Sequence, residues 1–328
     1  MIRRRDFVLA SLAAPFVATT ARALAPTLTL YTSQPQQDAQ RTVSAFMAAN
    51  PGTTVEFVRD GTTQLMARLR AEFAAGQPRP DVLLIADSVT MESLKSENRL
   101  QAHAAAPVAG YPDGVHDPAK FWFGTKLITT GIVFNRQATL RPTSWMDLLR
   151  PEIRGQIVMP SPLVSGAAMI QFAAMSQAPD FGWSYFERLA ANRARAQGGN
   201  GDVMRQVAGG ERLYGVIVDF LPIREAARGV PVEFVFPREG VPAISEPVGI
   251  LSTARNVELS RRFVDFLLSR PGQDLATAMG YVPALPGVAL PPGFPSRDAI
   301  RLMPLDPARA LRDEPEIRRQ FDRIFGGA

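Results

Sequence analysis

Residues Thr27–Gln34 have the sequence TLTLYTSQ, in which apolar and β-branched residues are followed by three polar ones. A short run of this kind predicts a buried strand that ends in a loop. The same order occurs twice more, with Thr54–Val58 followed by Asp60–Thr63 and Val82–Ile85 followed by Asp87–Ser88. A helix is expected after each of these loops. The repeated order of strand, polar loop and helix predicts an α/β fold whose sheets are covered by helices.

The rest of the chain continues this alternation. Helical spacing is clear in Leu65, Leu69 and Phe73, and in Val257–Leu268, whose apolar residues form one stripe. The first predicted helix ends at Asn50–Gly52, where proline and glycine stop it. We interpret the apolar stripes as core packing and assign them no function. Further strands are expected at Gly131–Phe134, Gln156–Met159, Leu213–Val218 and Val232–Phe236.

The polar loops after the strands form the candidate ligand-binding site. In open α/β sheets, ligands bind beyond the carboxyl ends of the strands. Helix N-termini gather there, and their unpaired backbone N–H groups and partial positive charge favour an anion. The alternative is plain helix capping, which requires the same residue types. The candidate residues in these loops are Thr32, Ser33, Gln34, Gly61, Thr62, Thr63, Asp87, Ser88, Ser161, Ser165, Gly166 and Ala167.

Two carboxylates, Asp219 and Glu246, complete the candidate site. Asp219 follows the apolar run Val216–Val218, and Glu246 precedes a proline. Because carboxylate pairs can do acid and base work, an exported hydrolase that uses this pair is an alternative of another class. For Asp219 the competing interpretation is a helix N-cap, and for Glu246 it is an exposed loop position.

The N-terminal segment predicts export to the periplasm. Arg3–Arg5 precede the mostly apolar run Phe7–Val17, and small residues follow, which is the pattern of a signal peptide over residues 1–25. The apolar run is too short to span a bilayer as a helix. We favour cleavage after Ala23 over cleavage after Ala25, which a proline follows. The segment Arg4–Val8 also resembles a twin-arginine signal, so both that route and Sec export stay open.

Composition excludes several classes of function. The 328 residues include no cysteine, which excludes disulfides, thiolate catalysis and cysteine metal sites. The signal segment carries four arginines and one aspartate, so its removal lowers the net charge from +5 to about +2 and leaves no basic cluster for nucleic acid or a membrane. His103 and His116 lack partners at metal or triad spacing, and we expect both at surface or loop positions. Gly199–Gly201 begins a dinucleotide fingerprint but does not complete it, and no catalytic motif is found.

The second half of the chain resembles a known family of exported binding proteins. The resemblance is carried by Val203–Glu211, Tyr214–Asp219, Gly229–Val232, Phe236–Gly240 and Phe263–Pro283. The chain is similar there, and over nearly all of its mature length, to the periplasmic solute-binding proteins of ABC importers. That family includes ferric-ion, 2-aminoethylphosphonate and sugar-phosphate binding proteins.

The resemblance implies a two-lobed periplasmic-binding-protein fold of type II, with mixed sheets flanked by helices and hinge strands between the lobes. We expect residues 26–127 and 252–328 in the first lobe and 128–251 in the second, with crossings near Leu127–Val133 and Val248–Ser252. It also implies a monomeric receptor that binds no cofactor or metal, catalyses nothing, and delivers a small anionic organic ligand to a permease in the inner membrane.

The resemblance also bears on the ligand. Ferric binders of this family carry two adjacent tyrosines where this chain has Phe220 and Leu221, which do not bind iron. An iron receptor would need phenolates from elsewhere, such as Tyr214 or Tyr281, and stays an alternative. Organophosphate binders are more similar in Ser161–Ala167, where helix amides and a serine hydroxyl would hold a phosphate or phosphonate.

In that case Asp219 and Glu246 would accept hydrogen bonds from an ammonium or from sugar hydroxyls at the far end of the ligand. A polyamine or thiamine binder that uses the same two carboxylates is a further alternative.

Overall fold

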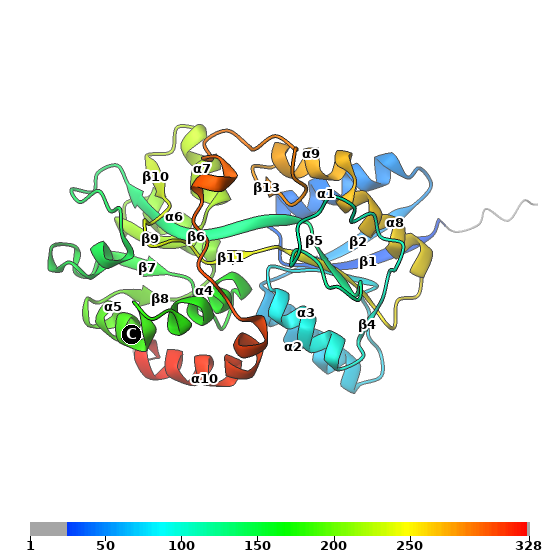
Figure 1. Ribbon diagram of the computed structural model, residues 1–328, viewed down its shortest axis with the longest axis horizontal. Coiled ribbons are helices and arrows are strands. Elements are labelled where there is room, and N and C mark those ends of the chain that lie inside the picture. Colours follow the sequence, from blue (N-terminus) through cyan, green and yellow to red (C-terminus); the bar gives the residue numbers. More distant parts are fainter. Residues whose placement is uncertain (1–24, 327–328) are drawn as a thin grey trace, which may run out of the picture.

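The computed structural model describes residues 25–326, which fold into two lobes, each built around its own sheet (Figure 1). The predicted signal peptide, apart from its last residue, lies outside the described residues. All seven predicted strands are present, and the helix predicted over Val257–Leu268 has those bounds. No helix in residues 25–326 has the length and apolar character needed to cross a membrane.

The first lobe is a sheet of six strands whose two faces are both covered by helices. Leu28 and Leu30 pack on one face against Phe46 and Phe263, whereas Tyr31 points to the other face and packs against Leu65. Because side chains alternate between the two faces, the strand Thr27–Thr32 is buried on both sides. The strands lie in the order β2 (Thr54–Arg59), β1 (Thr27–Thr32), β3 (Val82–Leu84), β12 (Pro247–Leu251) and β4 (Leu100–Gln101), with β5 (Trp122–Gly124) on β12. The helices are α1 (Gln36–Ala49), α2 (Thr62–Ala74), α3 (Ser88–Ser96), α8 (Val257–Leu268) and α9 (Arg270–Ala278).

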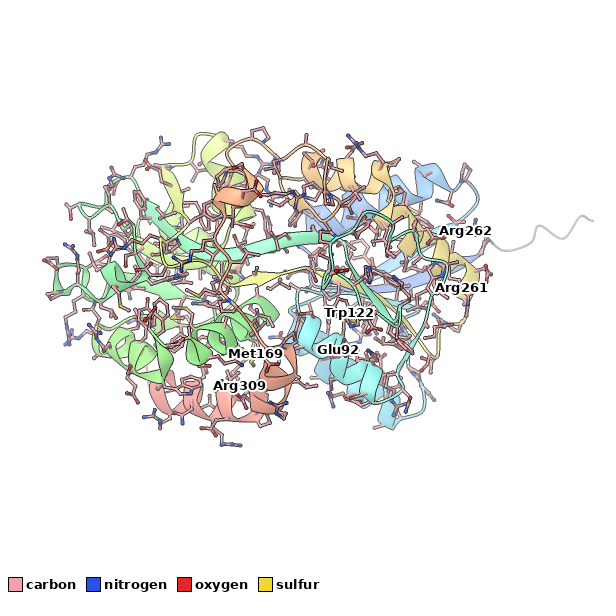
Figure 2. The ribbon with its side chains drawn as sticks, in the orientation of Figure 1. Glu92, Trp122, Met169, Arg261, Arg262 and Arg309 are labelled. Atoms are coloured by element: carbon pink, nitrogen blue, oxygen red, sulfur yellow. The ribbon has the colours of Figure 1, made fainter. Side chains whose placement is uncertain are left out.

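Side-chain hydrogen bonds fix the helices of this lobe on the sheet. Trp122 in β5 donates its indole N–H to Glu92 in α3 at 2.7 Å (Figure 2). His103 is buried in a loop and lies 2.8 Å from the carboxylate of Asp265 in α8. Its loop position agrees with the expectation, but its side chain is buried rather than at the surface. His116 also lies in a loop and is partly buried.

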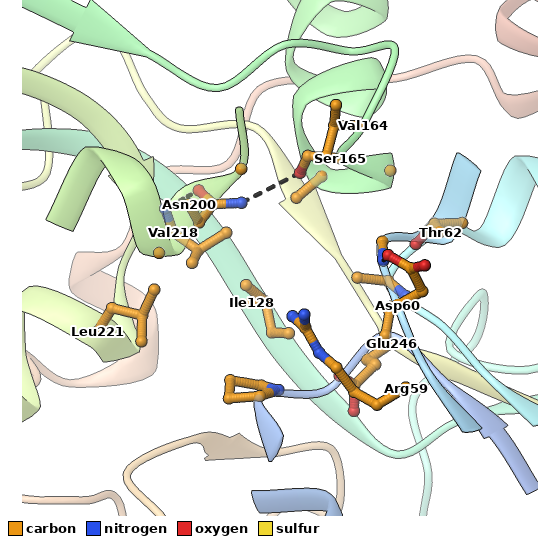
Figure 3. Close-up of a pocket in the computed structure, with 18 of the residues that line it drawn as sticks. Arg59, Asp60, Thr62, Ile128, Val164, Ser165, Asn200, Val218, Leu221 and Glu246 are labelled. Carbon is orange, nitrogen blue, oxygen red and sulfur yellow. Dashed lines mark hydrogen bonds between the residues drawn. The ribbon is translucent and has the colours of Figure 1, made fainter. Parts of the chain in front are cut away.

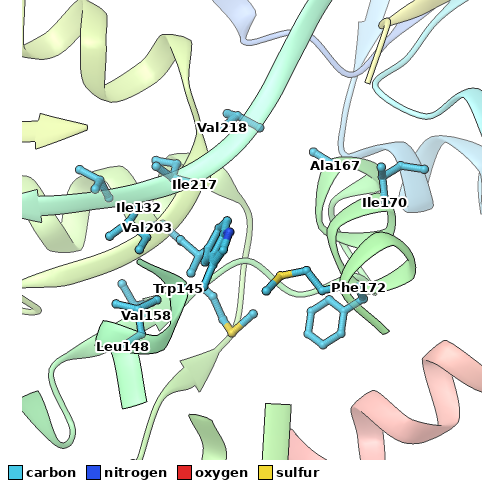
Figure 4. Close-up of a cluster of buried hydrophobic side chains, with 14 of the residues drawn as sticks. Ile132, Trp145, Leu148, Val158, Ala167, Ile170, Phe172, Val203, Ile217 and Val218 are labelled. Carbon is cyan, nitrogen blue, oxygen red and sulfur yellow. The ribbon is translucent and has the colours of Figure 1, made fainter. Parts of the chain in front are cut away.

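The second lobe is a mixed sheet of seven strands. Trp145, Phe172 and Ile217 are fully buried in its core (Figure 4). Its strands lie in the order β10 (Val232–Val235), β6 (Lys126–Asn135), β9 (Tyr214–Val218), β7 (Ile157–Met159) and β8 (Arg195–Ala196), with β11 (Ala243–Ile244) and β13 (Val282–Pro283) on β6. Its helices are α4 (Gly166–Gln177), α5 (Gly182–Ala191), α6 (Asn200–Ala208) and α7 (Phe220–Ala227), with short 3-10 turns at Trp145–Leu149, Pro151–Ile153 and Arg297–Ala299.

The chain crosses between the lobes at two adjacent segments, β5 to β6 and β11 to β12 (Figure 1). Thr125 joins them, because its N–H donates to the carbonyl of Ser245 at 3.0 Å and its hydroxyl donates to that of Glu246 at 2.9 Å. We expected the second crossing near Val248–Ser252. It lies a few residues earlier, because β12 pairs with β3, β4 and β5 of the first sheet.

The last helix, α10 (Pro307–Phe325), corrects the expected extent of the first lobe. We expected all of residues 252–328 there, and α8 and α9 do belong to it. However, Phe321 and Phe325 pack edge-on against Phe172 of the second lobe. Their ring centroids lie 5.5 and 6.3 Å, respectively, from that of Phe172. The first turns of α10 also touch α3, so this helix contacts both lobes (Figure 1). An amphipathic stripe shows that a helix packs but not on which lobe.

Candidate ligand-binding cleft

A cavity of about 410 Å³ lies between the two lobes, close to the crossing strands (Figure 3). This volume suits a small organic molecule. The first lobe and the second crossing contribute Ser33, Pro35, Arg59, Asp60, Gly61, Thr62, Ala86 and Glu246. The second lobe contributes Ile128, Val164, Ser165, Gly166, Ala167, Gly199, Asn200, Gly201, Asp202, Val218, Phe220 and Leu221.

Helix N-termini surround this cleft, as the sequence predicted. The first residues of α2, α4, α6 and α7 all line it. At α4 the amides of Gly166 and Ala167 have no hydrogen-bond partner within residues 25–326, and the same holds for Asn200 and Gly201 at α6. These groups, with the positive ends of the helix dipoles, make the cleft favourable for an anion.

Ser165 and Asn200 hold two of these helix ends together. The Ser165 hydroxyl accepts from the amide of Ala168, which makes Ser165 the N-cap of α4. It also accepts from the side-chain amide of Asn200 at 3.0 Å (Figure 3). The Asn200 carbonyl in turn accepts from the amide of Val218 at 3.1 Å, at the end of β9. These hydrogen bonds hold the N-termini of α4 and α6 and the end of β9 together on the second-lobe side of the cleft.

Arg59 supplies a cation that has no ion-pair partner among the described residues. It ends β2, its Nε donates to the carbonyl of Gln34 at 2.8 Å, and its guanidinium points into the cleft (Figure 3). The nearby carboxylates accept from backbone amides, Asp60 from Gly61 and Asp202 from Gly199, at 2.8 and 2.9 Å, and neither is within ion-pair distance of Arg59. The guanidinium is thus available to an anionic ligand.

Glu246 lies at the floor of the cleft and is almost fully buried, not exposed. Its carboxylate is 2.6 Å from the ammonium of Lys126, and it accepts from the side chain of Gln34 at 3.3 Å. Burial raises the pKa of the Glu246 carboxyl, while the charge of Lys126 and the hydrogen bonds to its carboxylate act in the opposite direction. The position of Glu246 at the cleft agrees with its choice as a candidate, but its charge is already paired.

Asp219 does not line the cleft. Its carboxylate accepts from the amide and hydroxyl of Thr129 at 2.9 and 2.7 Å and from the amide of Phe220, at the start of α7. Burial raises the pKa of Asp219 to about 7 against the opposing effect of these donors. This geometry is that of a buried helix cap.

The structure brings together some of the other predicted residues and separates the rest. Ser33, Gly61, Thr62, Ser165, Gly166 and Ala167 line the cleft, whereas Thr32, Gln34, Ser88 and Ser161 do not. Thr63 and Asp87 line a second, smaller cavity of about 200 Å³ between α2, α3, α4 and α10. Asp87 caps α3, and burial raises its pKa to about 6.

Several cleft residues were missed from the sequence. Arg59 lies between the predicted strand Thr54–Val58 and the loop Asp60–Thr63 and was assigned to neither, and Gly199–Gly201 was interpreted only as an incomplete dinucleotide fingerprint. The usable signal for Gly199–Gly201 is that small residues directly precede an amphipathic helix, which marks a helix N-terminus. The apolar lining, formed by Ile128, Val218 and Leu221, has no local signal that separates it from core.

The two lobes touch across the mouth of the cleft. A Cβ atom on Gly166 would come within 2.8 Å of the carbonyl oxygen of Ala86 and 2.9 Å of the Thr62 hydroxyl, both in the first lobe. A Cβ atom on Gly61 would clash with the carbonyl oxygen of Val164. Glycine at these two positions permits this close approach, and the two lobes are in contact here as a closed form requires.

The tyrosines that could bind iron lie outside the cleft. Tyr214 and Tyr281 do not line the cleft, and their hydroxyls contact the backbone of Leu140 and the carboxylate of Asp38. Within the described part of the chain, no group of three or more histidine, cysteine or acidic residues is arranged to hold a metal ion.

A two-lobed α/β fold that closes on a cleft between its lobes defines the class of solute-binding proteins. Residues 77–309 match the model of the bacterial extracellular solute-binding protein family, and the chain belongs to that family. The members of this family are substrate-binding proteins of ABC importers rather than enzymes.

Among solved structures, the fold is similar to that of the periplasmic binding protein AfuA from Actinobacillus pleuropneumoniae, with bound fructose-6-phosphate. That match has a TM-score of 0.82 and 23% identity, over 92% of this chain and 99% of AfuA. Iron-bound HitA from Pseudomonas aeruginosa has a TM-score of 0.77 and 21% identity, over 90% of this chain and 98% of HitA. Iron uptake protein A1 of Synechocystis sp. is 22% identical over 80% of this chain and 77% of its own length.

Proposed function

We propose that this protein is the periplasmic substrate-binding component of an ABC importer for a small phosphonate or phosphate ester. This is the ligand class to which 2-aminoethylphosphonate and sugar phosphates belong. One observation carries the proposal: helix N-termini with free amides converge on a cleft lined by one arginine, Arg59, which points inward and has no ion-pair partner within residues 25–326. A dianionic phosphonate or phosphate satisfies these donors better than a neutral or cationic ligand does.

The proposed function implies a sequence of steps from export to delivery of the ligand. A signal peptide exports the chain, the monomer binds its ligand in the periplasm, and the closed form docks on a permease in the inner membrane. Ligand contacts with both lobes stabilise the closed form relative to an open one, so binding shifts the population toward the form that this structure represents.

The ferric-ion alternative is favoured by the names of two similar proteins, HitA and iron uptake protein A1. The cleft lining offers Phe220 and Leu221 but no tyrosine or histidine. The lining has carboxylates but no phenolate, and within the described residues no three acidic, histidine or cysteine residues are arranged to hold a metal ion, so the cleft is poorly suited to Fe(III). We expect no visible charge-transfer band when Fe(III) is added to the purified protein, and a band would favour the iron receptor instead.

A ligand screen tests the proposal directly. The purified mature chain is heated with methylphosphonate, 2-aminoethylphosphonate, glucose 6-phosphate, spermidine or Fe(III), and hits are titrated by calorimetry. A ligand at a hundred times its Kd should add about 2.7 kcal/mol to the stability of the native state. We expect phosphonates or phosphate esters to raise the melting temperature and spermidine to leave it unchanged.

The opposite ranking, or stabilisation by spermidine alone, would refute the anion assignment. The same samples test the hydrolase alternative, because release of inorganic phosphate from glucose 6-phosphate would show turnover. We expect none, since Asp219 lies outside the cleft and Glu246 is paired with Lys126.

A further inference from the structure

Four apolar side chains of the second lobe line one part of the cleft. This apolar wall is formed by Ile128 of β6, Val218 of β9, and Phe220 and Leu221 at the start of α7. Figure 3 shows Ile128, Val218 and Leu221 across the cavity from Thr62 and Asp60. None of these side chains carries a polar atom, so any part of a ligand that lies on this wall loses water without gaining a hydrogen bond from it.

The carboxylates that would serve a polar ligand body are not available on this wall. Asp219, next to Phe220 in sequence, is bonded to Thr129 and turned out of the cleft. Glu246 is in the cleft, but Lys126 at 2.6 Å and Gln34 at 3.3 Å already occupy its Oε2. Acceptors for a ligand ammonium or hydroxyls are therefore confined to the rest of the lining, at Asp60, Asp202 and the second carboxylate oxygen of Glu246, and the helix ends offer donors only.

The effect of this wall on affinity depends on the part of the ligand beyond its anionic group, which we call the ligand body. Hydroxyl groups buried without partners lose their hydration and weaken binding. An aromatic ring or alkyl chain gains from removal of its apolar surface from water, and even a single methylene in an apolar pocket changes affinity by roughly tenfold or more.

From this we infer that the natural ligand carries an apolar body: an aryl or alkyl phosphonate, or the phosphate ester of such a body, rather than a polyhydroxylated sugar phosphate. This inference rests on the proposed function and narrows its ligand class. The anionic group lies at the N-termini of α4 and α6 beside Arg59, and the body lies on the wall of Ile128, Val218, Phe220 and Leu221.

Calorimetric titration with three anions tests the inference. Phenylphosphonate, glucose 6-phosphate and inorganic phosphate share the anionic end and differ in the body. We expect phenylphosphonate to bind at least tenfold more tightly than either of the others. If glucose 6-phosphate binds as tightly as phenylphosphonate or more so, the inference is wrong while the proposed function stands. If none of the three binds, the inference is wrong, and if methylphosphonate and 2-aminoethylphosphonate also fail to bind, the proposed function fails with it.

Substitutions in the apolar wall separate the contribution of the ligand body to affinity from that of the anionic group. Leu221→Asn should weaken phenylphosphonate about tenfold and change the Kd of inorganic phosphate less than twofold, because only the body touches this side chain. Leu221→Val is a milder second variant that keeps the wall apolar and should retain most of the affinity. Leu302→Asn is the control, since Leu302 is 47% exposed and does not line the cleft. Equal losses for both ligands in Leu221→Asn would contradict the inference.

Discussion

The hinge and the cleft contain charged groups in opposite situations. At the hinge, Lys126 is paired with Glu246 at 2.6 Å, and Arg224 of the second lobe is paired with Asp38 of the first at 3.0 Å. In the cleft, the guanidinium of Arg59 has no ion-pair partner among residues 25–326. The charged groups at the hinge are thus paired within the chain, whereas the cation of Arg59 is left for a ligand. The difference separates residues that stabilise the closed fold from residues that serve a ligand.

The hinge network also explains how the lobes stay aligned. Asp38 in α1 accepts from Arg224 in α7 and from the hydroxyl of Tyr281 at 2.6 Å. The ammonium of Lys126 lies 4.1 Å from the centroid of the Tyr281 ring. Each buried charge of this hinge network therefore has a partner, which is the condition under which buried charges are tolerated.

Loss of the hinge cation should have the largest effect. Lys126→Met leaves Glu246 buried without a counter-charge, so we expect the free energy of unfolding to fall by about 3–5 kcal/mol in urea denaturation. The double variant with Glu246→Gln should recover most of this loss. As a control, Arg136→Met breaks an exposed pair with Glu233 and should change stability by less than about 1 kcal/mol. A loss as small as that in Lys126→Met would show that the hinge pair is not structural.

The buried cap Asp219 should make stability depend on pH. Because burial raises its pKa from 3.8 to about 7, its neutral form is favoured in the folded state, and this contribution is complete below about pH 4 and lost as the pH rises through 7. Relative to Asp219→Asn, which does not titrate, the wild type should lose on the order of 3 kcal/mol between pH 4 and pH 7. Urea denaturation of both proteins at several pH values measures this. Parallel stability curves would show that Asp219 stays charged.

Removal of the unpaired cation of the cleft, Arg59, should affect affinity far more than stability. Arg59→Gln should raise the Kd of a phosphate ester or phosphonate by about 10- to 100-fold, because one charge-assisted interaction is lost. Its melting temperature without ligand should fall only slightly, since Arg59 loses one hydrogen bond to the carbonyl of Gln34 and no ion pair. Arg136→Gln serves as the control and should leave affinity unchanged. A change of less than twofold in Arg59→Gln would place the anion elsewhere.

A smaller effect is expected where the lobes meet. Gly166→Ala places a methyl group 2.8 Å from the carbonyl oxygen of Ala86, which hinders closure, so affinity should fall about tenfold for every ligand regardless of its body. Gly199→Ala is the matched control, because its methyl group would meet nothing closer than 3.9 Å. Calorimetry with phenylphosphonate and inorganic phosphate distinguishes hindered closure from a local clash. A loss confined to one ligand would contradict the role in closure.

The sequence predicts the parts of the fold that depend on local patterns. The strands and Val257–Leu268 were correct, because short apolar runs and helical stripes are encoded over a few residues. The placement of β12 and α10 was not, because the lobe on which an element packs depends on partners far along the chain.

The same limit applies to the cleft. Loops after strands identified Ser33, Thr62 and Ser165 at its lining, because strand ends and helix starts collect at one edge of a sheet. The direction of a side chain within such a loop is decided by tertiary contacts. Asp219 turns toward Thr129 rather than the cleft for this reason, and no local pattern marks Arg59 as free of a partner.

The structure of the complex with phenylphosphonate would test the central claim most directly. The account predicts phosphonate oxygens within about 3.2 Å of the amides of Gly166 and Ala167 and of the Arg59 guanidinium, with the ring against Val218 and Leu221. A phosphonate bound outside the cleft, or a cleft that stays empty at saturating ligand, would contradict it.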